Sequence, residues 1–376
     1  MISFGTTIRR LFEVAGALVA LLMLLCAYSP LLDPEQHPVL ACAGMAFPIF
    51  AFLNGVFLLL WLLLRWRSAW VALLSFALCY GALRDCLPLH FSRPEPPEGS
   101  IRLLSFNTMA FGDGQPHRKG KPNTALDYLA TSGADILCLQ EYIAGRDKYH
   151  LQHRDVERAL RDYPYRRYLQ VGTNDNGLGI YSRFPILSQR KLPYESLYNG
   201  SAMYELDVCG DTLVIINNHL ESNKLTLEDK RLYRQMLHSP EKENVEQGAR
   251  LLIGRLSEAM AIRARQTRLI GHLVDSLLER GRRVVVCGDC NDTPVSFTHR
   301  RLTRRLHSAF VQAGNGLGVS YNQNGFYFRI DHILLSPGMR AFDCRVDRSI
   351  RVSDHYPIVC SIAWEGLCNH PSKSKP

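Results

Sequence analysis

The sequence predicts an α/β domain that follows a membrane anchor of three helices, and three observations lead to this fold class. Apolar stretches dominate the chain up to about residue 90 of its 376 residues. A short proline-rich segment follows them. After it, short apolar runs typical of β-strands alternate with amphipathic runs typical of helices, which predicts sheets layered with helices.

Residues 1–88 are expected to anchor the chain in a membrane as three transmembrane helices. The apolar stretches run from Val14 to Leu32, from Val39 to Leu64 and from Ala69 to Leu87. Each is close to the ~20 residues with which a helix crosses ~30 Å of hydrocarbon. A cleaved signal peptide would explain only the first stretch, and buried core helices would rarely follow one another three times without charged faces.

Basic residues beside the spans predict their orientation. The pair Arg9–Arg10 precedes the first span, and Arg65 and Arg67 lie between the second and the third, whereas Asp33 and Glu35 lie between the first two. Because cytoplasmic loops carry the excess of Lys and Arg, the N-terminus is expected in the cytoplasm. Three crossings then place the rest of the chain outside the inner (cell) membrane of a bacterium, in the periplasm. If the third stretch does not cross the membrane, the rest of the chain is instead expected on the cytoplasmic side.

The remainder divides into a Pro-rich linker (residues 89–99), a folded domain (100–366) and a polar tail (367–376). Its eight predicted strands are Ile101–Phe106, Asp135–Gln140, Gly179–Ser182, Ala202–Val208, Thr212–Asn217, Arg283–Cys287, Arg329–Leu335 and Pro357–Ala363. Helices are expected over Thr124–Ser132, Asp155–Asp162 and Glu246–Arg280, the last one ended by Gly281. The charged insertion Leu225–Glu246 is interpreted as a solvated surface segment or as a contributor to substrate selection or membrane contact.

Charge and cysteine usage narrow the functional classes. The formal net charge of +9 suits an anionic substrate or an anionic membrane face, with solubility as the alternative explanation. The 11 cysteines form no dense disulfide framework, and those after residue 90 argue mildly against an oxidising compartment, although the charge pattern carries more weight. Cys287 and Cys290 form a C-x-x-C at the end of a strand, where a redox pair is not expected.

Six polar motifs fall where predicted strands end. They are Ser105–Asn107 (SFN), Leu139–Glu141 (LQE), Asn217–Leu220 (NNHL), Gly288–Asn291 (GDCN), Arg329–His332 (RIDH) and Ser353–His355 (SDH). A single Asn at such a place usually forms a turn, and a single His is usually structural. Six motifs within one domain instead indicate a shared site, because strand ends commonly present polar groups to one rim.

These motifs resemble those of the endonuclease/exonuclease/phosphatase superfamily, which includes deoxyribonuclease I, abasic-site endonucleases, neutral sphingomyelinases and inositol polyphosphate 5-phosphatases. The resemblance covers Ile101 to Trp364 and includes Gly177–Ile186 (GLGIYSRFPI). It implies a deoxyribonuclease I-like four-layer α/β sandwich, in which helices flank two packed sheets. It also implies hydrolysis of phosphoric esters with a divalent metal ion.

The resemblance further implies a metal site. Glu141 would be a main ligand of Mg²⁺ or Mn²⁺, with Asn107 and Asp354 close by. Carboxylate and amide oxygens suit such hard cations. The ion would bind a phosphate oxygen and stabilise charge on the leaving group.

Catalytic roles follow from the same resemblance. Asp289 would orient or deprotonate the attacking water, and Asn291 would help to hold the water and the phosphate. His219 would donate to the phosphate oxygens, and Asn217 belongs to the same substrate-binding group. The reaction would be an in-line attack of water at phosphorus.

A histidine paired with a carboxylate completes the expected site. His355 would contact the phosphate, and Asp331 would orient its ring and favour its charged form. Three positions depart from the patterns common in the superfamily: Cys290 replaces a frequent aromatic residue, His332 stands where abasic-site endonucleases usually carry Tyr, and Asn218 replaces a frequent Thr. None of the three removes an expected catalytic group.

Taken together, the residues predict a membrane-integral Mg²⁺- or Mn²⁺-dependent hydrolase of a phosphodiester, either nucleic acid or a phospholipid headgroup. The alternatives are a phosphomonoesterase on a soluble metabolite and a non-catalytic membrane scaffold or binding protein that retains the fold. A transporter is not expected, because the spans carry few charges at mid-depth. The sequence indicates no obligate protein partner.

Overall fold

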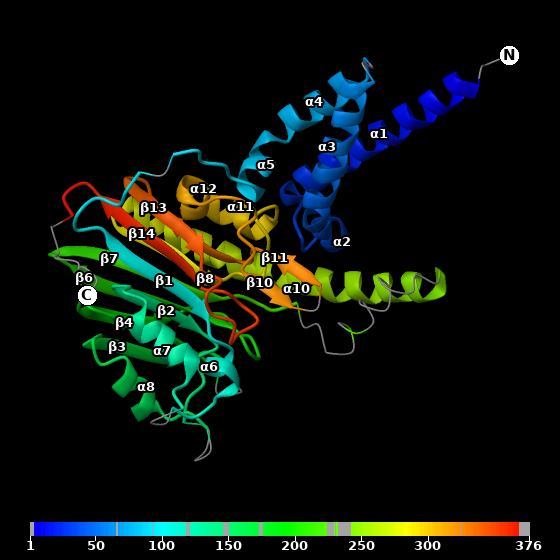
Figure 1. The fold of residues 1–376 in the computed structure, drawn as a ribbon. Helices are drawn as coiled ribbons and strands as arrows, with labels where there is room; N and C mark the ends of the chain where they lie inside the picture. Colours follow the sequence, from blue (N-terminus) through cyan, green and yellow to red (C-terminus); the bar gives the residue numbers. More distant parts are fainter. Residues whose placement is uncertain are drawn as a thin grey trace.

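Two six-stranded β-sheets packed face to face form the centre of the computed structural model (Figure 1). The structure describes residues 4–64, 67–92, 94–117, 121–145, 150–172, 176–223, 229, 231, 242–323 and 325–367. Most of the charged insertion Leu225–Glu246, most of the polar tail, and Arg65 therefore lie outside the described residues.

Both sheets are mixed, because each contains parallel and antiparallel pairs of neighbouring strands. The first sheet contains β13 (Met339–Val346), β14 (Ile358–Trp364), β1 (Ile101–Asn107), β2 (Ile136–Gln140), β4 (Gly177–Ser182) and β3 (Tyr165–Gln170), in that spatial order. The second sheet contains β5 (Ile186–Lys191), β6 (Gly200–Val208), β7 (Asp211–His219), β8 (Arg283–Asp289), β12 (Asp331–Leu335) and β9 (His307–Ser308). All eight predicted strands are present, with ends within about two residues of those expected.

Two central pairs are parallel, β1 with β2 and β7 with β8. Strands buried on both faces are near-continuous apolar runs, as in Val284–Cys287. Between the sheets, side chains such as Ile136, Ile215 and Val285 are fully buried. Each such side chain contributes roughly 1.5–3 kcal/mol through its removal from water.

Helices cover the outer face of each sheet and complete four layers. On the first sheet, α7 (Thr124–Thr131) and α8 (His153–Ala159) bury Leu126, Leu129 and Val156. On the second sheet, α10 (Lys242–Glu279) and α11 (Phe297–Thr303) bury Ile270, Val274 and Leu302. The helix α10 ends where the sequence predicts, before Gly281 at φ +70°. The expected α/β sandwich of two sheets is thus confirmed.

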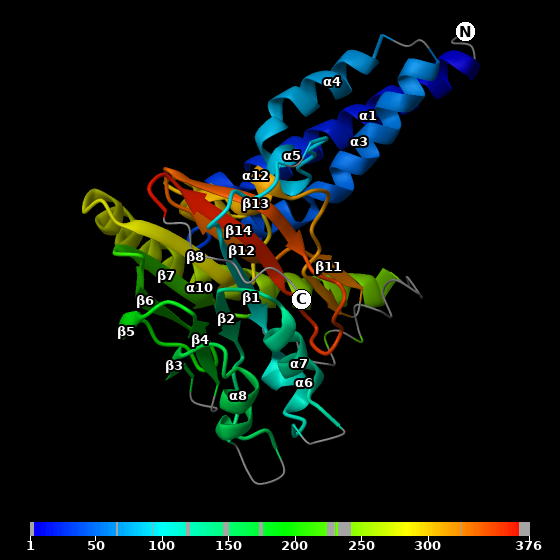
Figure 2. The same ribbon diagram turned by 60° about the vertical axis from the view of Figure 1, so that its left-hand side comes forward.

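The N-terminal part contains α1 (Phe4–Tyr28), η1 (Ser29–Leu31), α2 (Pro38–Ala41), η2 (Cys42–Ala46), α3 (Phe47–Leu63), α4 (Ala69–Leu78) and α5 (Tyr80–Cys86). Two stretches, Thr7–Leu31 and Pro38–Leu63, are long and apolar enough to cross a membrane. Helices α1, α3 and α4 lie side by side and extend away from the sheets, with the N-terminus at the far end (Figure 2).

The expectation of three continuous membrane helices requires a correction. The third stretch is bent by 71° between α4 and α5, so it counts as a span only if the bent pair is taken as one. The bend turns Arg84 and Asp85 away from the direction of α4, which suits charged groups that hydrocarbon excludes. The carbonyl of Leu78, freed at the break, accepts a 2.9 Å hydrogen bond from the Tyr28 hydroxyl.

The N-terminal part packs closely on the second sheet's side of the domain. Asp33 and Glu35 form ion pairs with Arg268, and Glu35 also pairs with Arg265 at 3.0 Å, both on α10. Deeper in the contact, a Cβ added to Gly44 would lie 2.0 Å from the Val295 carbonyl oxygen. Only glycine therefore allows this approach.

The proline-rich segment also contacts the domain. The His90 backbone N–H donates to Asn315 at 2.6 Å, and its ring Nδ1 lies 2.8 Å from the Gly314 carbonyl oxygen. The segment expected to act as a spacer is therefore held at this point. The cysteines also differ in environment: Cys287 and Cys360 are buried free thiols, whereas Cys209 is exposed at the β6–β7 turn and disulfide-bonded.

Candidate active site

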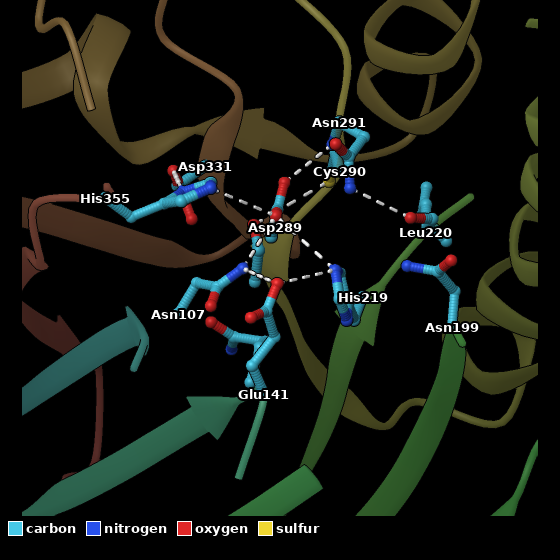
Figure 3. A network of polar contacts seen from close by, with 12 residues as sticks. Asn107, Glu141, Asn199, His219, Leu220, Asp289, Cys290, Asn291, Asp331 and His355 are labelled. Carbon is cyan, nitrogen blue, oxygen red and sulfur yellow. Dashed lines mark hydrogen bonds and ion pairs between the residues drawn. The ribbon is translucent and has the colours of Figure 1, made fainter. Parts of the chain in front are cut away.

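The strand registers bring the polar motifs together. In the second sheet, Asp289 pairs with His219 on one side and with Asp331 on the other. In the first sheet, Asn107 pairs with Gln140, and Glu141 follows directly. Because β1 and β2 pack against β7 and β8, both groups meet at one edge of the sandwich (Figure 3).

Asp289 is the centre of this cluster and is 1% exposed. Its Oδ2 accepts a hydrogen bond from Asn107 Nδ2 at 3.0 Å and lies 3.5 Å from His355 Nε2 and 3.7 Å from His219 Nε2. Its Oδ1 accepts from the Asn291 backbone N–H at 2.8 Å. Burial raises the pKa of Asp289, and the neighbouring His355 opposes that rise.

His355 lies between two carboxylates. Its Nδ1 is 2.8 Å from Asp331 Oδ2, and its Nε2 faces Asp289. Burial alone would lower its pKa, but the charges of Asp331 and Asp289 outweigh burial and raise the pKa well above the ordinary value. His355 is therefore held as an imidazolium.

His219 differs from His355 in its surroundings. Its Nε2 lies 3.7 Å from both Glu141 Oε1 and Asp289 Oδ2. Burial lowers the pKa of His219, and the attraction of Asp289 only partly compensates. The two imidazoles beside Asp289 thus favour different protonation states.

Glu141 follows β2 in a left-handed conformation at φ +47°, a backbone state that costs a non-glycine residue about 1–2 kcal/mol. The Thr108 hydroxyl contacts the Gln140 and Glu141 carbonyl oxygens at 3.1 and 3.0 Å. The turn leaves the Glu141 side chain 31% exposed, and Glu141 and Asp354 line the same pocket of about 190 Å³.

The donor set of this pocket fits a hard divalent cation. Burial raises the pKa of Glu141, the Asn107 amide opposes the rise, and the Asp354 carboxylate adds to it. A cation between the two carboxylates would relieve their repulsion, and oxygen donors suit Mg²⁺ or Mn²⁺. Asn107 presents its amide nitrogen to Glu141 at 3.0 Å, while its oxygen accepts from the Met109 N–H at 3.2 Å.

A second group of possible ligands consists of Asp289, Asp331 and His355, whose donor atoms lie within 4.8 Å of one another. Both ring nitrogens of His355 already face carboxylates, and the ring favours its charged form. A metal needs a neutral imidazole with a free lone pair. We therefore interpret this group as a hydrogen-bonded relay and the Glu141–Asp354 pair as the better metal site.

The side chains of two expected site residues, Asn291 and Asn217, are directed away from the centre of the pocket. Asn291 lines the pocket, but its φ of +51° turns its side-chain nitrogen to the Leu220 carbonyl oxygen at 3.0 Å. Asn217 is fully buried between the sheets, where it accepts from Gln140 at 2.6 Å and donates to the Leu139 carbonyl at 3.2 Å. It lies beneath the site and joins the two sheets.

The structure adds residues that sequence reasoning missed. The Tyr321 ring packs edge-on to His355, with 5.0 Å between ring centroids. Tyr321 begins a hairpin of β10 (Tyr321–Gln323) and β11 (Phe326–Phe328), and Phe326 and Phe328 line the pocket. The Asn-Gly pair of residues 324–325 signals such a turn in the sequence. Met45 from the N-terminal part also lines the pocket, and no local pattern could have indicated it.

Comparison with known protein families identifies the family of this chain. Residues 104–355 match the family described as the Endonuclease/Exonuclease/phosphatase family. The chain belongs to the endonuclease/exonuclease/phosphatase family. Membership in that family indicates a hydrolase of phosphoric esters. Residues 9–86 match a second family, described as a domain of unknown function.

Solved structures similar to this member of the endonuclease/exonuclease/phosphatase family have low identity. An endonuclease/exonuclease/phosphatase from Beutenbergia cavernae is 17% identical with a TM-score of 0.49, over 71% of this chain and 72% of that one. Sphingomyelinase C from Streptomyces griseocarneus is 18% identical with a TM-score of 0.46, over 70% and 99%. D. rerio TDP2 complexed with a single-strand DNA product is 16% identical with a TM-score of 0.47, over 70% and 99%. No curated protein matches the chain.

Proposed function

We propose that the chain is a membrane-anchored, Mg²⁺- or Mn²⁺-dependent phosphodiesterase, with residues 1–88 as its anchor and residues 100–366 as its catalytic domain. One observation carries the proposal. The Asp289 carboxylate from the second sheet faces Asn107 from the first sheet and two imidazoles, beside a pocket that Glu141 also lines.

Asp289 is proposed to accept the proton of the attacking water. Burial raises its pKa, which moves a carboxylate towards the range useful to a general base. The Asn291 N–H fixes one carboxylate oxygen at 2.8 Å, which leaves the other directed at the shared centre. Water held there would attack phosphorus in line with the leaving oxygen.

The two histidines are proposed to bind the phosphate from separate sides. His355, charged through Asp331, would stabilise the negative charge that grows on the phosphate oxygens. His219 would donate from Nε2, the ring nitrogen that faces Asp289. Among the described residues its Nδ1 is buried without a partner, so the ring is free to adopt the Nε2–H tautomer.

Glu141 and Asp354 would hold the metal ion. When bound, such an ion supplies positive charge to a phosphate oxygen and to the leaving group. Asn107 would act beside the ion. Its side-chain amide donates to Glu141 and to Asp289, so it would hold the metal-binding carboxylate and the general-base carboxylate in separate positions although they lie close in space.

The catalytic domain is proposed to lie outside the cytoplasm of a bacterium. The N-terminus and the catalytic domain lie at opposite ends of α1, and Arg9 and Arg10 belong to the N-terminal end (Figure 2). The disulfide of Cys209 supports an oxidising compartment. A reporter fused after residue 367 would test on which side of the membrane the catalytic domain lies. A reporter that is active only in the periplasm is expected to be active, and activity of a reporter that works only in the cytoplasm would contradict the proposed location.

A direct test uses the full-length protein in detergent with bis(4-nitrophenyl) phosphate. Asp289→Asn is expected to lower kcat by about 10³-fold or more, because general-base catalysis typically contributes 10²–10⁴-fold. The matched control is Asp207→Asn at the opposite end of the β6–β7 hairpin, which should keep full activity. Chelation by EDTA should abolish turnover, and added Mg²⁺ or Mn²⁺ should restore it.

Three outcomes would contradict the proposal. Asp289→Asn with wild-type kcat would remove the carboxylate from the mechanism. Turnover that survives EDTA would remove the metal ion. If no phosphodiester is hydrolysed by the folded wild type, the scaffold alternative becomes the better interpretation.

A further inference from the structure

A second cavity adjoins the catalytic pocket at the contact between anchor and domain. Its volume is about 240 Å³. It shares Met45, Thr293 and Phe328 with the catalytic pocket, so the two spaces have a common wall. Its apolar lining comes from both parts of the chain and includes Met45, Pro48, Ile49, Val295, Leu317 and Tyr327.

One wall of this cavity continues into the membrane anchor. Pro48 and Ile49 belong to α3, which lies in the apolar stretch Pro38–Leu63. Ile49 is 60% exposed and begins a row of exposed apolar side chains at helical spacing along α3. The row comprises Ile49, Phe52, Val56, Leu59 and Leu63. In a bilayer this row faces the lipid chains and leads directly to the cavity.

The opposite wall belongs to the catalytic domain. Tyr327 on the β10–β11 hairpin is 65% exposed, and Leu317 is 49% exposed. Tyrosine is enriched where proteins meet the membrane–water interface. On the same hairpin, Tyr321 packs against His355. The hairpin therefore joins the apolar cavity to the catalytic histidine.

We infer that this cavity binds an alkyl chain of the substrate, and that the enzyme therefore acts on a lipid phosphodiester; the inference rests on the proposed phosphodiesterase function. The phosphate would lie between His219 and His355 while the chain runs past Met45 towards Ile49 and the bilayer. A largely apolar lining next to a membrane span suits a hydrocarbon chain. A nucleic-acid strand would instead need a cationic groove along its backbone, and Arg329, the charged residue in this lining, is hydrogen-bonded to the Leu317 and Asp85 carbonyls.

The test uses two chromogenic diesters that differ only in their alkyl group, 4-nitrophenyl methyl phosphate and 4-nitrophenyl octyl phosphate. Attack of water releases 4-nitrophenolate from each and leaves the alkyl phosphate. The full-length protein is assayed in a steroid-based detergent, with both substrates below their micellar concentrations. A buried methylene contributes about 0.8 kcal/mol, or about fourfold, so kcat/KM is expected to favour the octyl ester by at least tenfold.

Two variants narrow the cavity from opposite walls, Ile49→Trp and Leu317→Trp. Both residues are exposed, so the larger side chain can be accommodated without disturbing the core. Each variant is expected to lower the octyl-to-methyl ratio of kcat/KM at least tenfold. Phe52→Trp is the matched control on α3, because Phe52 is 71% exposed and does not line the cavity. It should keep the wild-type ratio.

The outcomes separate this inference from the proposed function. Equal kcat/KM for the two esters, a ratio that neither variant changes, or a faster reaction with a single-stranded oligonucleotide would overturn the lipid assignment while leaving the phosphodiesterase intact. Failure of the wild type to hydrolyse either ester would instead overturn the phosphodiesterase itself.

Discussion

His332 lies next to Asp331 on β12, and its ring is 5.0 Å from that of His299. Its Nε2 donates to the Asp292 carbonyl oxygen at 2.9 Å. Burial lowers the pKa of His332 to about 4 from 6.5, and the nearby Arg329 adds to the effect. A neutral histidine at this place therefore links the pH of the solution to the stability of the site.

This linkage gives a prediction with a defined sign. The unfolded chain binds a proton at His332 near pH 6.5, whereas the folded chain binds it only near pH 4. The stability that the neutral His332 contributes to the fold is therefore fully present above about pH 6.5 and is lost as the pH falls towards 4. Between pH 7 and pH 5 the loss is about 2 kcal/mol. His332→Gln keeps a donor for Asp292 and cannot titrate, so thermal unfolding should show a smaller fall in Tm over this range. An unchanged fall would assign the acid sensitivity to other groups.

Arg329 connects three elements through one buried side chain. Its guanidinium donates to the Leu317 carbonyl at 3.1 Å and to the Asp85 carbonyl of α5, and it lies 4.2 Å from the Phe310 ring centroid. Burial lowers its pKa to about 10, so it stays charged at neutral pH. Since β12 begins two residues later at Asp331, this contact places the start of that strand.

Loss of this guanidinium is expected to cost stability. Arg329→Met would leave the two carbonyl oxygens without their donors inside the protein, at about 1–3 kcal/mol for each buried group. Chemical denaturation of the full-length protein would measure the change. Arg340→Met is the matched control, because Arg340 is exposed and, among the described residues, its guanidinium lies over the Phe342 ring, 5.8 Å from the centroid. Equal free energies of unfolding for the two variants would contradict this role.

The strand ends were predictable because their signals are local. An apolar run followed by a polar residue, as in Val284–Asp289, is visible in the sequence alone. Five predicted residues do line one pocket, and Asp331 lies behind it against His355; the five are Glu141, His219, Asp289, Asp354 and His355. Asn217 shows the limit of this reasoning. It shares a face of β7 with His219 but lies two residues further from the strand end, so it contacts the other sheet instead.

Features that depend on contacts between distant segments could not be predicted. The bend after Leu78 follows from the packing of α5 on the domain, and only the charges of Arg84 and Asp85 hinted at it. The contribution of Met45 to the pocket depends on how the N-terminal part lies against the domain. No periodicity within either segment contains that information.

At the scale of the whole molecule, ion pairs join the loop after α1 to α10. Arg268 pairs with Asp33 and Glu35, and these side chains are about one-third exposed. Such pairs are weakened by salt. They act together with the buried apolar contact around Val295 to orient the domain on the N-terminal part.

Charge reversal should test this orientation. Arg268→Glu would place a third acidic group beside Asp33 and Glu35, so the Tm in low salt is expected to fall by a few degrees. The fall should shrink in 0.5 M NaCl, and the second change Glu35→Arg should reverse part of it. Arg250→Glu is the control, because among the described residues Arg250 pairs with the exposed Glu246 of its own helix, at 3.7 Å, and not with Asp33 or Glu35. A salt-independent fall would indicate a packing defect instead.

The contact between Gly44 and Val295 bears on how the enzyme can be dissected or rebuilt. Without residues 1–88, a truncated domain would lose the Met45 wall of its pocket and expose Val295 to water. With an unrelated transmembrane helix in place of residues 1–88, any side chain at the position of Gly44 would collide with the Val295 carbonyl. Residues 1–88 and the catalytic domain thus fit each other specifically. They have to be inherited, expressed and engineered together.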